Sequence, residues 1–326
     1  MNRINYYGTL GPACGSYETL LDMFKVGMTG IRLNLSHVDL KDSREWLDNY
    51  NKAARMAGVE PELLIDLEGP ELRIGNLKNP IGLKSGEVVI LGEKGIPVPP
   101  CIISTAEVGE RILLSDGLIE LYVIENQGES LLCKVISGGV LHSKKSIATP
   151  KDNINPTLTQ RDYRNLASAV EFGVTGVMLP FVRGKDDLMV LREALLKEKV
   201  EGIRVYAKIE NIHGVKKLKE IIDYCDEIVI ARGDLGNSMP LWELPGVQKD
   251  ISELCRSKCK PFMIVTQMLN SMIENAVPTR AEVLDIYNAV IDGAASVMLT
   301  GETAQGKYPV AAMEYLVKTS QEALKK

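Results

Sequence analysis

Residues 204–211 read RVYAKIEN and combine a buried strand with two opposite charges at its end. Residues 205–207 suit the interior of a sheet or barrel, whereas Lys208 and Glu210 follow on one side of a strand with a period of two. A lysine and a carboxylate at the end of an apolar run are rarely buried without a partner. This stretch therefore predicts a buried strand whose carboxyl end forms part of a binding site.

Similar short apolar runs recur along the whole chain and alternate with longer amphipathic ones. The runs expected to be strands are 4–10, 29–35, 62–67, 175–181, 203–209, 226–232, 261–267 and 295–301. The stretches expected to be helices are 16–28, 41–57, 159–172, 185–198, 214–224, 243–257, 279–292 and 309–325. Eight strand–helix repeats predict an α/β protein with a (β/α)8 TIM barrel, although a doubly wound sheet shows the same alternation.

One interval of about ninety residues after the third strand has a different pattern. Short β-rich runs are joined there by Ser-Gly, Asp-Gly, Gln-Gly and Gly-Gly turns, which are typical of hairpins. A loop after a barrel strand tolerates such an insertion. We therefore expect a small all-β barrel domain at residues 74–153, inserted into a catalytic barrel formed by residues 1–73 and 154–326.

The composition excludes some classes of function. A formal net charge of −5 argues against a general binder of nucleic acid or of anionic membranes. No apolar run approaches the roughly 18 residues of a spanning helix, and the first 15 residues lack the apolar region of a signal peptide. Six scattered cysteines with only three histidines are typical of reduced thiols, so we expect a cytoplasmic protein.

Polar side chains gather at the carboxyl ends of the predicted strands. They are Arg32, Asn34, Ser36, His37, Asp66, Lys208, Glu210, Arg232, Asp234, Thr266 and Thr300. A single aspartate or threonine at such a position is more often a helix cap or a turn former. The same feature on six strands is better explained by one shared site, because all carboxyl ends of a barrel point to one face.

The residue types indicate the chemistry of this site. Glu210 and Asp234 suit Mg²⁺, which prefers one or two protein carboxylates and leaves positions for water and substrate oxygens. Lys208 and Arg32 provide fixed positive charge for a phosphoryl group in transfer. Gly233 allows a tight turn, after which backbone amides can face an anion. Further oxygen ligands for a hard monovalent or divalent ion are Asn34, Ser36 and Asp66.

Taken together, these motifs resemble those of the pyruvate kinase family. They are GTLGPAC, IRLNLSH, LIDLEGPELRIG, LSDGLIEL, GGVLHSKKSI, YAKIENIHGV, IVIARGDLG and VTQMLNSMIENAVPTRAEVLDIYNAVIDGAASVMLTGETAQGKYP, in family order across nearly the whole chain. The resemblance implies a barrel with an inserted β-domain that closes over the site. It also implies transfer of the phosphoryl group of phosphoenolpyruvate to ADP, which gives pyruvate and ATP through a magnesium-bound enolpyruvate.

The resemblance also implies a role for each matching residue. Arg32 and Lys208 would hold the transferring phosphoryl group, and Glu210 and Asp234 would bind Mg²⁺ or Mn²⁺. The substrate carboxylate would meet the amides of Gly233 and Asp234 and the Thr266 hydroxyl. The implied K⁺ ligands are Asn34, Ser36, Asp66 and the carbonyl of Leu67. The implied nucleotide contacts are His37, Arg73, Lys145 and Asn34. Thr300 would protonate the enolate, directly or through a water relay shared with Thr266.

Departures from the family pattern leave three hypotheses open. The chain ends at Lys326, just after the eighth predicted barrel helix, so we expect a form without the family's regulatory domain. Leu67, Glu68 and Pro180 replace the family's usual rim residues. The favoured hypothesis is a minimal pyruvate kinase, for which a homo-oligomer formed through the barrel is also considered. The others are a magnesium–enolate enzyme acting on a different phosphoryl acceptor, 2-oxo acid or enol phosphate, and a non-catalytic ligand-binding paralogue.

Overall fold

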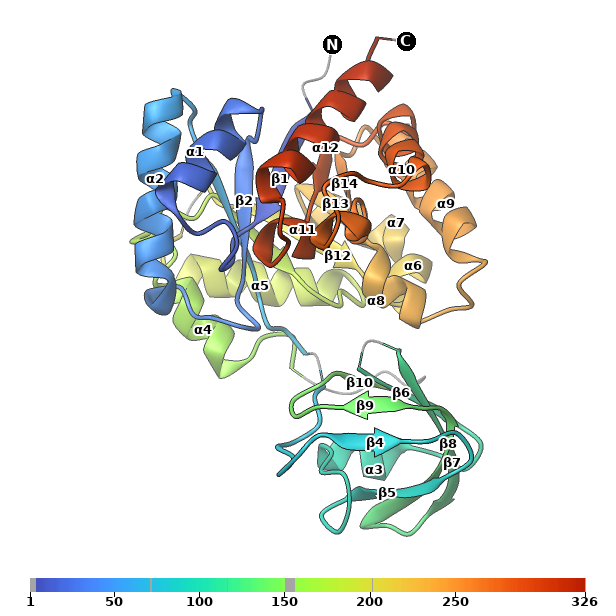
Figure 1. The fold of residues 1–326 in the computed structure, drawn as a ribbon. Coiled ribbons are helices and arrows are strands. Elements are labelled where there is room, and N and C mark those ends of the chain that lie inside the picture. Colours follow the sequence, from blue (N-terminus) through green and yellow to red (C-terminus); the bar gives the residue numbers. More distant parts are fainter. Residues whose placement is uncertain (1–3, 71, 116, 150–155, 201, 326) are drawn as a thin grey trace. The chain divides into compact units, whose positions relative to one another are not determined.

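A computed structural model describes residues 4–70, 72–115, 117–149, 156–200 and 202–325, and its chain divides into two compact units (Figure 1). The first unit comprises Met1–Gly69 and Thr157–Lys326, and the second comprises Pro70–Pro156. The first division therefore falls four residues before the boundary expected after residue 73. The second expected boundary, between residues 153 and 154, lies outside the described residues.

Eight parallel strands form a closed barrel in the first unit, in the order β1-β15-β14-β13-β12-β11-β3-β2. They are β1 (Asn5–Thr9), β2 (Gly30–Asn34), β3 (Glu62–Asp66), β11 (Gly176–Leu179), β12 (Arg204–Ile209), β13 (Glu227–Ala231), β14 (Phe262–Val265) and β15 (Ser296–Met298). Because β1 pairs with both β2 and β15, the sheet closes on itself. The predicted (β/α)8 barrel is thereby confirmed, and the open doubly wound sheet is excluded.

Helices follow the strands around the outside of this barrel (Figure 1). They are α1 (Tyr17–Lys25), α2 (Arg44–Ala57), α4 (Gln160–Ala167), α5 (Lys185–Lys197), α6 (Ile212–Lys216), α7 (Leu218–Ile221), α9 (Leu244–Ser257), α10 (Arg280–Ile291) and α12 (Pro309–Ala323). Shorter helical segments are α8 (Arg232–Asn237), α11 (Gly301–Ala304), η1 (Lys41–Ser43), η2 (Ile222–Tyr224) and η3 (Asn270–Ile273). The stretch predicted as one helix at 214–224 is thus divided between α6, α7 and η2.

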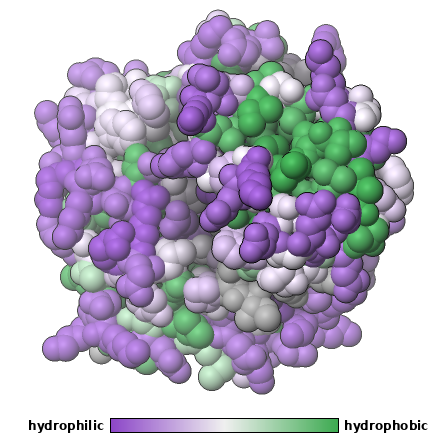
Figure 2. Space-filling model, turned by 90° about the horizontal axis from the view of Figure 1, so that it is seen from below, coloured by the Kyte–Doolittle hydropathy of each residue, from purple (hydrophilic) through white to green (hydrophobic). Residues whose placement is uncertain are grey.

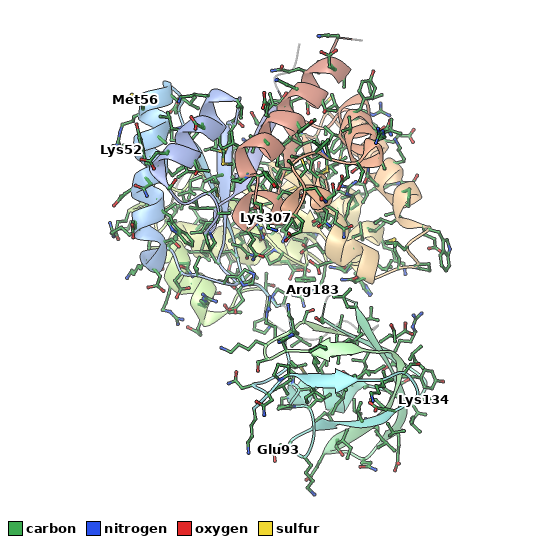
Figure 3. All side chains as sticks on the ribbon, viewed as in Figure 1. Lys52, Met56, Glu93, Lys134, Arg183 and Lys307 are labelled. Atoms are coloured by element: carbon green, nitrogen blue, oxygen red, sulfur yellow. The ribbon has the colours of Figure 1, made fainter. Side chains whose placement is uncertain are left out.

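Local sequence signals explain where two of these helices begin. Thr159 and Asp162 form a capping box at the start of α4, and Thr279 and Glu282 form another at the start of α10. The 14-residue α2 is amphipathic, and its buried face packs on the barrel. The exposed Met56 side chain lies on its outer face and points away from the barrel (Figure 3). These signals are local in sequence, which is why the helices were predictable.

Two apolar layers result from the alternation along each barrel strand. The inner layer fills the barrel and consists of Tyr7, Leu64, Met178, Tyr206, Val229, Ala231, Met263, Val265 and Met298. The outer layer, between strands and helices, includes Val205 and Ala207. Residues 205–207 therefore divide between two cores rather than sharing one. Lys208 lies two residues after the inward-facing Tyr206, so it belongs to the inner face at the carboxyl end of β12.

The second unit contains antiparallel β-structure, as expected for the insertion. Its strands are β4 (Ile81–Leu83), β5 (Val88–Gly92), β6 (Arg111–Leu114), β7 (Ile119–Asn126), β8 (Ser130–Ser137), β9 (Gly139–Leu141) and β10 (Ile147–Ala148). They pair as one sheet in the order β10-β6-β7-β8-β5 and as a second sheet formed by β4 and β9. A short helix, α3 (Pro100–Thr105), was not predicted; it begins with proline at its first position, where the missing N–H has no cost.

The molecular surface is mainly hydrophilic on the face shown in Figure 2, with an apolar area on one side of it. A quarter of the residues are charged, which accounts for the hydrophilic surface. None of the helices in the described ranges has both the length and the apolar composition needed to cross a membrane.

Gly69 is a position in the first unit where we expect a single methyl group to be harmful. Its φ of +61° is left-handed, and an added Cβ would overlap the Pro180 ring. Gly58, at the end of α2, is a matched control, because its φ is +67° but an added Cβ meets nothing within 4 Å. We expect Gly58→Ala to lower the free energy of unfolding by about 1 kcal/mol and Gly69→Ala by about 3 kcal/mol.

Urea unfolding followed by tryptophan fluorescence would measure this difference. Both tryptophans, Trp46 and Trp242, belong to the first unit, so the signal reports the barrel. Equal losses in the two variants would show that Pro180 does not restrict Gly69.

Candidate active site

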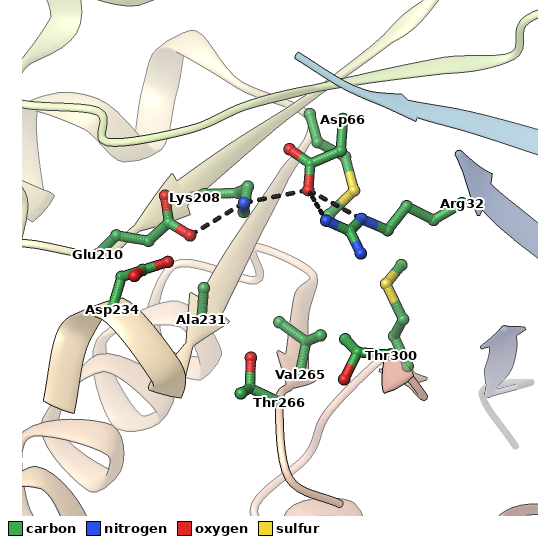
Figure 4. Close-up of a pocket in the computed structure, with 11 residues that line it drawn as sticks. Arg32, Asp66, Lys208, Glu210, Ala231, Asp234, Val265, Thr266 and Thr300 are labelled. Atoms are coloured by element: carbon green, nitrogen blue, oxygen red, sulfur yellow. Dashed lines mark hydrogen bonds and ion pairs between the residues drawn. The ribbon is translucent and has the colours of Figure 1, made fainter. Parts of the chain in front are cut away.

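A pocket opens at the carboxyl ends of the barrel strands (Figure 4). Its lining is Arg32, Asp66, Met178, Lys208, Glu210, Ala231, Asp234, Val265, Thr266, Met298 and Thr300. Seven of these residues were candidate site residues from the sequence, and the fold brings them together from six different strands or the turns that follow them. The remaining four are apolar and form the top of the barrel's inner layer.

Lys208 lies between two carboxylates at the base of the pocket. Its Nζ atom is 3.1 Å from Asp66 Oδ2 and 2.9 Å from Glu210 Oε1. Burial disfavours the charged ammonium, but Asp66 and Glu210 outweigh it and raise the pKa of Lys208 above its ordinary value. The lysine is therefore a permanent cation at neutral pH, held in place from both sides.

Arg32 contacts the same oxygen of Asp66 from the other side. Its Nε atom donates to Asp66 Oδ2 at 2.8 Å, and its Nη2 atom lies 2.6 Å from that oxygen. Burial alone would raise the pKa of the Asp66 carboxyl, yet Lys208 and Arg32 hold it below its ordinary value. Asp66 thus fixes two cations next to each other, an arrangement suited to an anionic group placed between them (Figure 4).

Glu210 is buried and has a defined orientation. Its Oε2 atom accepts a hydrogen bond of 2.8 Å from the backbone N–H of Phe181, and Oε1 faces Lys208. Phe181 has a φ of +52°, which is uncommon for a residue other than glycine. Figure 4 shows the carboxylates of Glu210 and Asp234 beside each other at one side of the pocket. Two adjacent carboxylates of this kind fit one Mg²⁺ ion.

Asp234 is placed by the helix that follows β13. The strand ends at Ala231 and α8 begins at Arg232, so Gly233 and Asp234 lie in its first turn. An added Cβ at Gly233 would lie 3.0 Å from Thr266 Cγ2, so glycine lets the turn approach Thr266 closely. This agrees with the expected short helix after the strand, whose first amides point toward the helix N-terminus.

Thr266 has a strained backbone, with a φ of +82° for a β-branched residue. Arg232 stabilises this conformation: its Nη2 atom donates to the Thr266 carbonyl at 2.7 Å, and its Nη1 atom donates to Asp285 at 2.8 Å. Arg232 therefore supports the Thr266 segment instead of lining the pocket. Strain of this kind is concentrated at functional sites, where the surrounding structure maintains it.

The oxygen ligands proposed for a second cation lie at the ends of β2 and β3. Asn34 and Asp66 are partners in the register of these two strands, and the Ser36 N–H donates to Asn34 Oδ1 at 3.2 Å. Asp66 Oδ1 is buried and has no hydrogen-bond partner among the described residues. A buried, unpaired carboxylate oxygen fits a cation such as K⁺. The Leu67 side chain packs in the outer core, so only its carbonyl is suited to act as a ligand.

The unusual rim residues are involved in local packing. Glu68 Oε2 accepts a hydrogen bond of 3.2 Å from the Thr159 hydroxyl, and Glu68 Oε1 lies 3.7 Å from Arg161 Nη1. The Pro180 ring lies where a side chain at Gly69 would be. Neither Glu68 nor Pro180 belongs to the pocket lining. Because Glu68 and Pro180 make local contacts outside the pocket, they give little support to the hypothesis of another substrate.

Glu302 was not identified from the sequence, although it lies two residues after Thr300. Its Oε2 atom accepts hydrogen bonds from the Thr300 N–H at 2.7 Å and from the Thr300 hydroxyl at 3.1 Å. Its Oε1 atom accepts from the Leu269 N–H at 3.0 Å. The buried carboxylate therefore orients the Thr300 hydroxyl. The available signal was the acidic residue at the start of a short helix, which is common at helix N-termini generally.

The expected nucleotide contacts belong to two units. His37 follows β2 in the first unit and is exposed. Arg73 pairs with Ser146, and the Ile74 N–H donates to the Lys145 carbonyl at 2.9 Å, so Arg73 and Lys145 lie on neighbouring segments of the second unit. Their role toward a nucleotide remains a prediction.

The fold and the pocket define a (β/α)8-barrel protein whose strand ends bring acidic and basic side chains together in one pocket. The sequence matches the family described as pyruvate kinase, barrel domain, over residues 1–313. The chain belongs to the pyruvate kinase family.

Individual relatives agree with this assignment. A pyruvate kinase of Geobacillus stearothermophilus is 38% identical over 318 residues, which cover 94% of this chain and 54% of the relative. One of Mycobacterium intracellulare is 39% identical over 316 residues, covering 94% of this chain and 66% of the relative. The chain thus spans about half to two thirds of these relatives. The crystal structure of a pyruvate kinase from Cryptosporidium parvum superimposes with a TM-score of 0.92 at 29% identity, covering 99% of this chain and 70% of that one.

Proposed function

We propose that the protein is a phosphotransferase that moves the phosphoryl group of phosphoenolpyruvate to ADP and so forms pyruvate and ATP. The observation that carries this proposal is the placement of Lys208 between Asp66 and Glu210, with Arg32 on the other side of Asp66. Two fixed cations next to each other, beside an acidic pair, suit a phosphoryl group that must be held and stabilised during transfer.

The charges of the pocket support an anionic substrate together with a divalent cation. Two cations, Lys208 and Arg32, face three carboxylates, so the residues alone carry one net negative charge. A Mg²⁺ or Mn²⁺ ion held by Glu210 and Asp234 would reverse this sign and would stabilise negative charge on the substrate. The pocket would then attract phosphoenolpyruvate, which carries both a phosphate and a carboxylate.

The chain's own residues would bind the substrate, protonate the enol and hold the second cation. Lys208 and Arg32 orient the phosphoryl group, and the amides of Gly233 and Asp234 with the Thr266 hydroxyl hold the carboxylate. The Thr300 hydroxyl, which is oriented by Glu302, is the proposed proton donor to the enol carbon after transfer. It acts either directly, with its own proton replaced from water, or by relaying a proton from water. Asp66 and Asn34, with Ser36 and the Leu67 carbonyl, are suited to K⁺, and the second unit would contribute Arg73 and Lys145 to nucleotide binding.

The proposed setting is the cytoplasm. All six cysteines are free thiols, and four of them are buried, which supports a reducing compartment. The proposed partners are small molecules, namely phosphoenolpyruvate or pyruvate and ADP or ATP, and a homo-oligomer formed through the barrel remains a prediction.

A turnover assay tests this proposal. The purified chain is mixed with phosphoenolpyruvate, ADP, Mg²⁺ and K⁺, and we expect pyruvate and ATP to form in equal amounts, with loss of activity when EDTA removes the metal. Pyruvate formed only with another acceptor would support the alternative substrate hypothesis. Binding of phosphoenolpyruvate without turnover under any condition would support a binding protein and overturn the proposal.

A further inference from the structure

A second polar group lies at the opposite end of the barrel strands from the candidate active site. We call it the basal cluster; its members are Tyr7, Glu62, Arg204, Tyr206, Glu227 and Ser296. Four of them are the first residues of their strands, β3, β12, β13 and β15. The neighbouring inner layer of the barrel is apolar, so these groups need partners within the cluster.

Arg204 provides one positive charge for two carboxylates. Its Nη2 atom donates to Glu227 Oε2 at 2.9 Å, and its Nη1 atom lies 3.7 Å from Glu62 Oε1. The Tyr7 hydroxyl donates to the other oxygen of Glu62. Glu62 is partly open to solvent, with 34% of its side chain exposed, whereas only 1% of the Glu227 side chain is exposed. The uncompensated negative charge is therefore most unfavourable on Glu227.

Three atoms of the cluster have no hydrogen-bond partner among the described residues. They are Glu227 Oε1, the Tyr206 hydroxyl oxygen and Ser296 Oγ, and all three are buried. An ionised carboxylate only accepts hydrogen bonds, so with Glu227 ionised its Oε1 atom stays unpaired unless a neighbouring hydroxyl turns toward it. A buried polar atom without a partner is costly. A proton on Oε1 would remove the charge and supply a donor to the nearby hydroxyl oxygens.

We propose that the basal cluster is a proton-binding site, in which Glu227 takes up one proton on Oε1 near neutral pH. With that proton bound, Arg204 balances the one remaining carboxylate, Glu62, and the cluster is neutral. Glu227 keeps its contact with Arg204 through Oε2. This inference does not depend on the proposed catalytic function.

The surroundings of Glu227 support this site. Burial raises the pKa of the Glu227 carboxyl to about 7. The Ser296 hydroxyl and Arg204 limit that rise in pKa, and the charge of Glu62 adds to it. The Ser296 hydroxyl is thus close enough to Glu227 to affect the pKa of its carboxyl.

The hydroxyl and thiol groups around Glu227 stay neutral near pH 7. Burial raises the pKa of the Tyr7 and Tyr206 hydroxyls above their ordinary value. Cys255, which approaches from α9, has a thiol pKa raised to about 12, first by burial and also by the nearby Glu227. Proton uptake near neutral pH is therefore assigned to Glu227.

The sign of the effect on stability follows from the raised pKa. The carboxyl has an ordinary pKa of 4.5 and a folded-state pKa of about 7, so between these values the folded chain binds more protons than the unfolded chain. Stability from this group is fully present below pH 4.5 and is lost as the pH rises through about 7.

Glu227→Gln is the variant that tests the site, because glutamine resembles the protonated carboxyl. Thermal unfolding of the full chain is followed by tryptophan fluorescence from pH 5.5 to 8.5. We expect wild type and variant to unfold at similar temperatures at pH 5.5, and wild type to unfold about 5 °C or more below the variant at pH 8.5. Glu60 is exposed, so Glu60→Gln is the matched control, and its unfolding temperature should change with pH as that of wild type does. A constant gap between wild type and Glu227→Gln would overturn the proposal.

Carbon-13 NMR of glutamate side-chain carboxyls measures the titration directly and does not require the variant to be as stable as wild type. We expect one carboxyl resonance of the wild-type chain to titrate near pH 7 and to be missing in Glu227→Gln. Glu62→Gln removes a neighbouring negative charge and should move that midpoint to lower pH. If every carboxyl titrates below about pH 5.5, the ordinary range, the site does not exist.

Discussion

Replacing Lys208 with methionine is expected to lower kcat for pyruvate formation by about 10³-fold or more. The ammonium lies 3.1 Å from Asp66 and 2.9 Å from Glu210, and it faces the space between them and Arg32. Methionine keeps most of the side-chain volume but removes the charge that the proposed transfer needs. The measurement is steady-state kinetics with phosphoenolpyruvate and ADP.

A folding control is necessary for this variant, because Lys208→Met leaves Glu210 without its cationic partner and Asp66 with Arg32 alone. Removing one partner of a buried ion pair destabilises by about 3–5 kcal/mol. Urea unfolding followed by tryptophan fluorescence shows whether the barrel remains folded under assay conditions. Lys219→Met, at an exposed position of α7, should keep full activity. A folded Lys208→Met variant with more than about a tenth of wild-type kcat would contradict the proposed role of the lysine.

The candidate site was predictable where it depends on strand periodicity. Lys208 and Glu210 follow a buried strand at a spacing of two, and Asp234, Thr266 and Thr300 follow other strands of the same kind. Parallel strands of a barrel end at one face, so the position of each residue along its own strand was enough to bring these groups together.

Features that depend on long-range pairing were not predictable. The left-handed backbone of Thr266 is held by Arg232, whose position at a strand end had pointed to the pocket instead. The role of Glu302 depends on where the chain turns after β15. The Arg232–Thr266 contact joins two strand ends whose spacing in the sequence carries no signal. The Glu302–Thr300 contact is local, but an acidic residue at a helix start is too common to indicate its role.

The basal cluster, at the other end of the strands, could not be predicted from the sequence either. Glu62, Arg204 and Glu227 each begin a strand, where a charged residue is unremarkable in sequence. Only the strand order of the closed barrel brings them onto one interior face, with β12 between β11 and β13. The strand β12 thus contributes residues to both sites. Arg204 and Tyr206 belong to the basal cluster, and Lys208, on the same face of the strand, belongs to the pocket.

Glu210→Gln is expected to have the second large effect, which is the loss of divalent-cation binding. The amide keeps the shape of the side chain and the hydrogen bond from the Phe181 N–H, but it removes one of the two negative charges proposed to hold Mg²⁺. We expect the Kd for Mn²⁺ to rise by about 100-fold, since changes outside the ligand set itself already cost 10–100-fold in metal affinity. Turnover should fall with it at fixed Mg²⁺.

Mn²⁺ binding followed by electron paramagnetic resonance separates this role from a structural one, because it requires no turnover. Glu68→Gln is the matched control: its carboxylate contacts Thr159 and Arg161 outside the pocket, so its Kd for Mn²⁺ should equal that of wild type. Excess Mn²⁺ should restore part of the activity of Glu210→Gln if Asp234 still binds the metal weakly. An unchanged Kd in Glu210→Gln would place the cation elsewhere, and Glu210 would then serve only to hold Lys208.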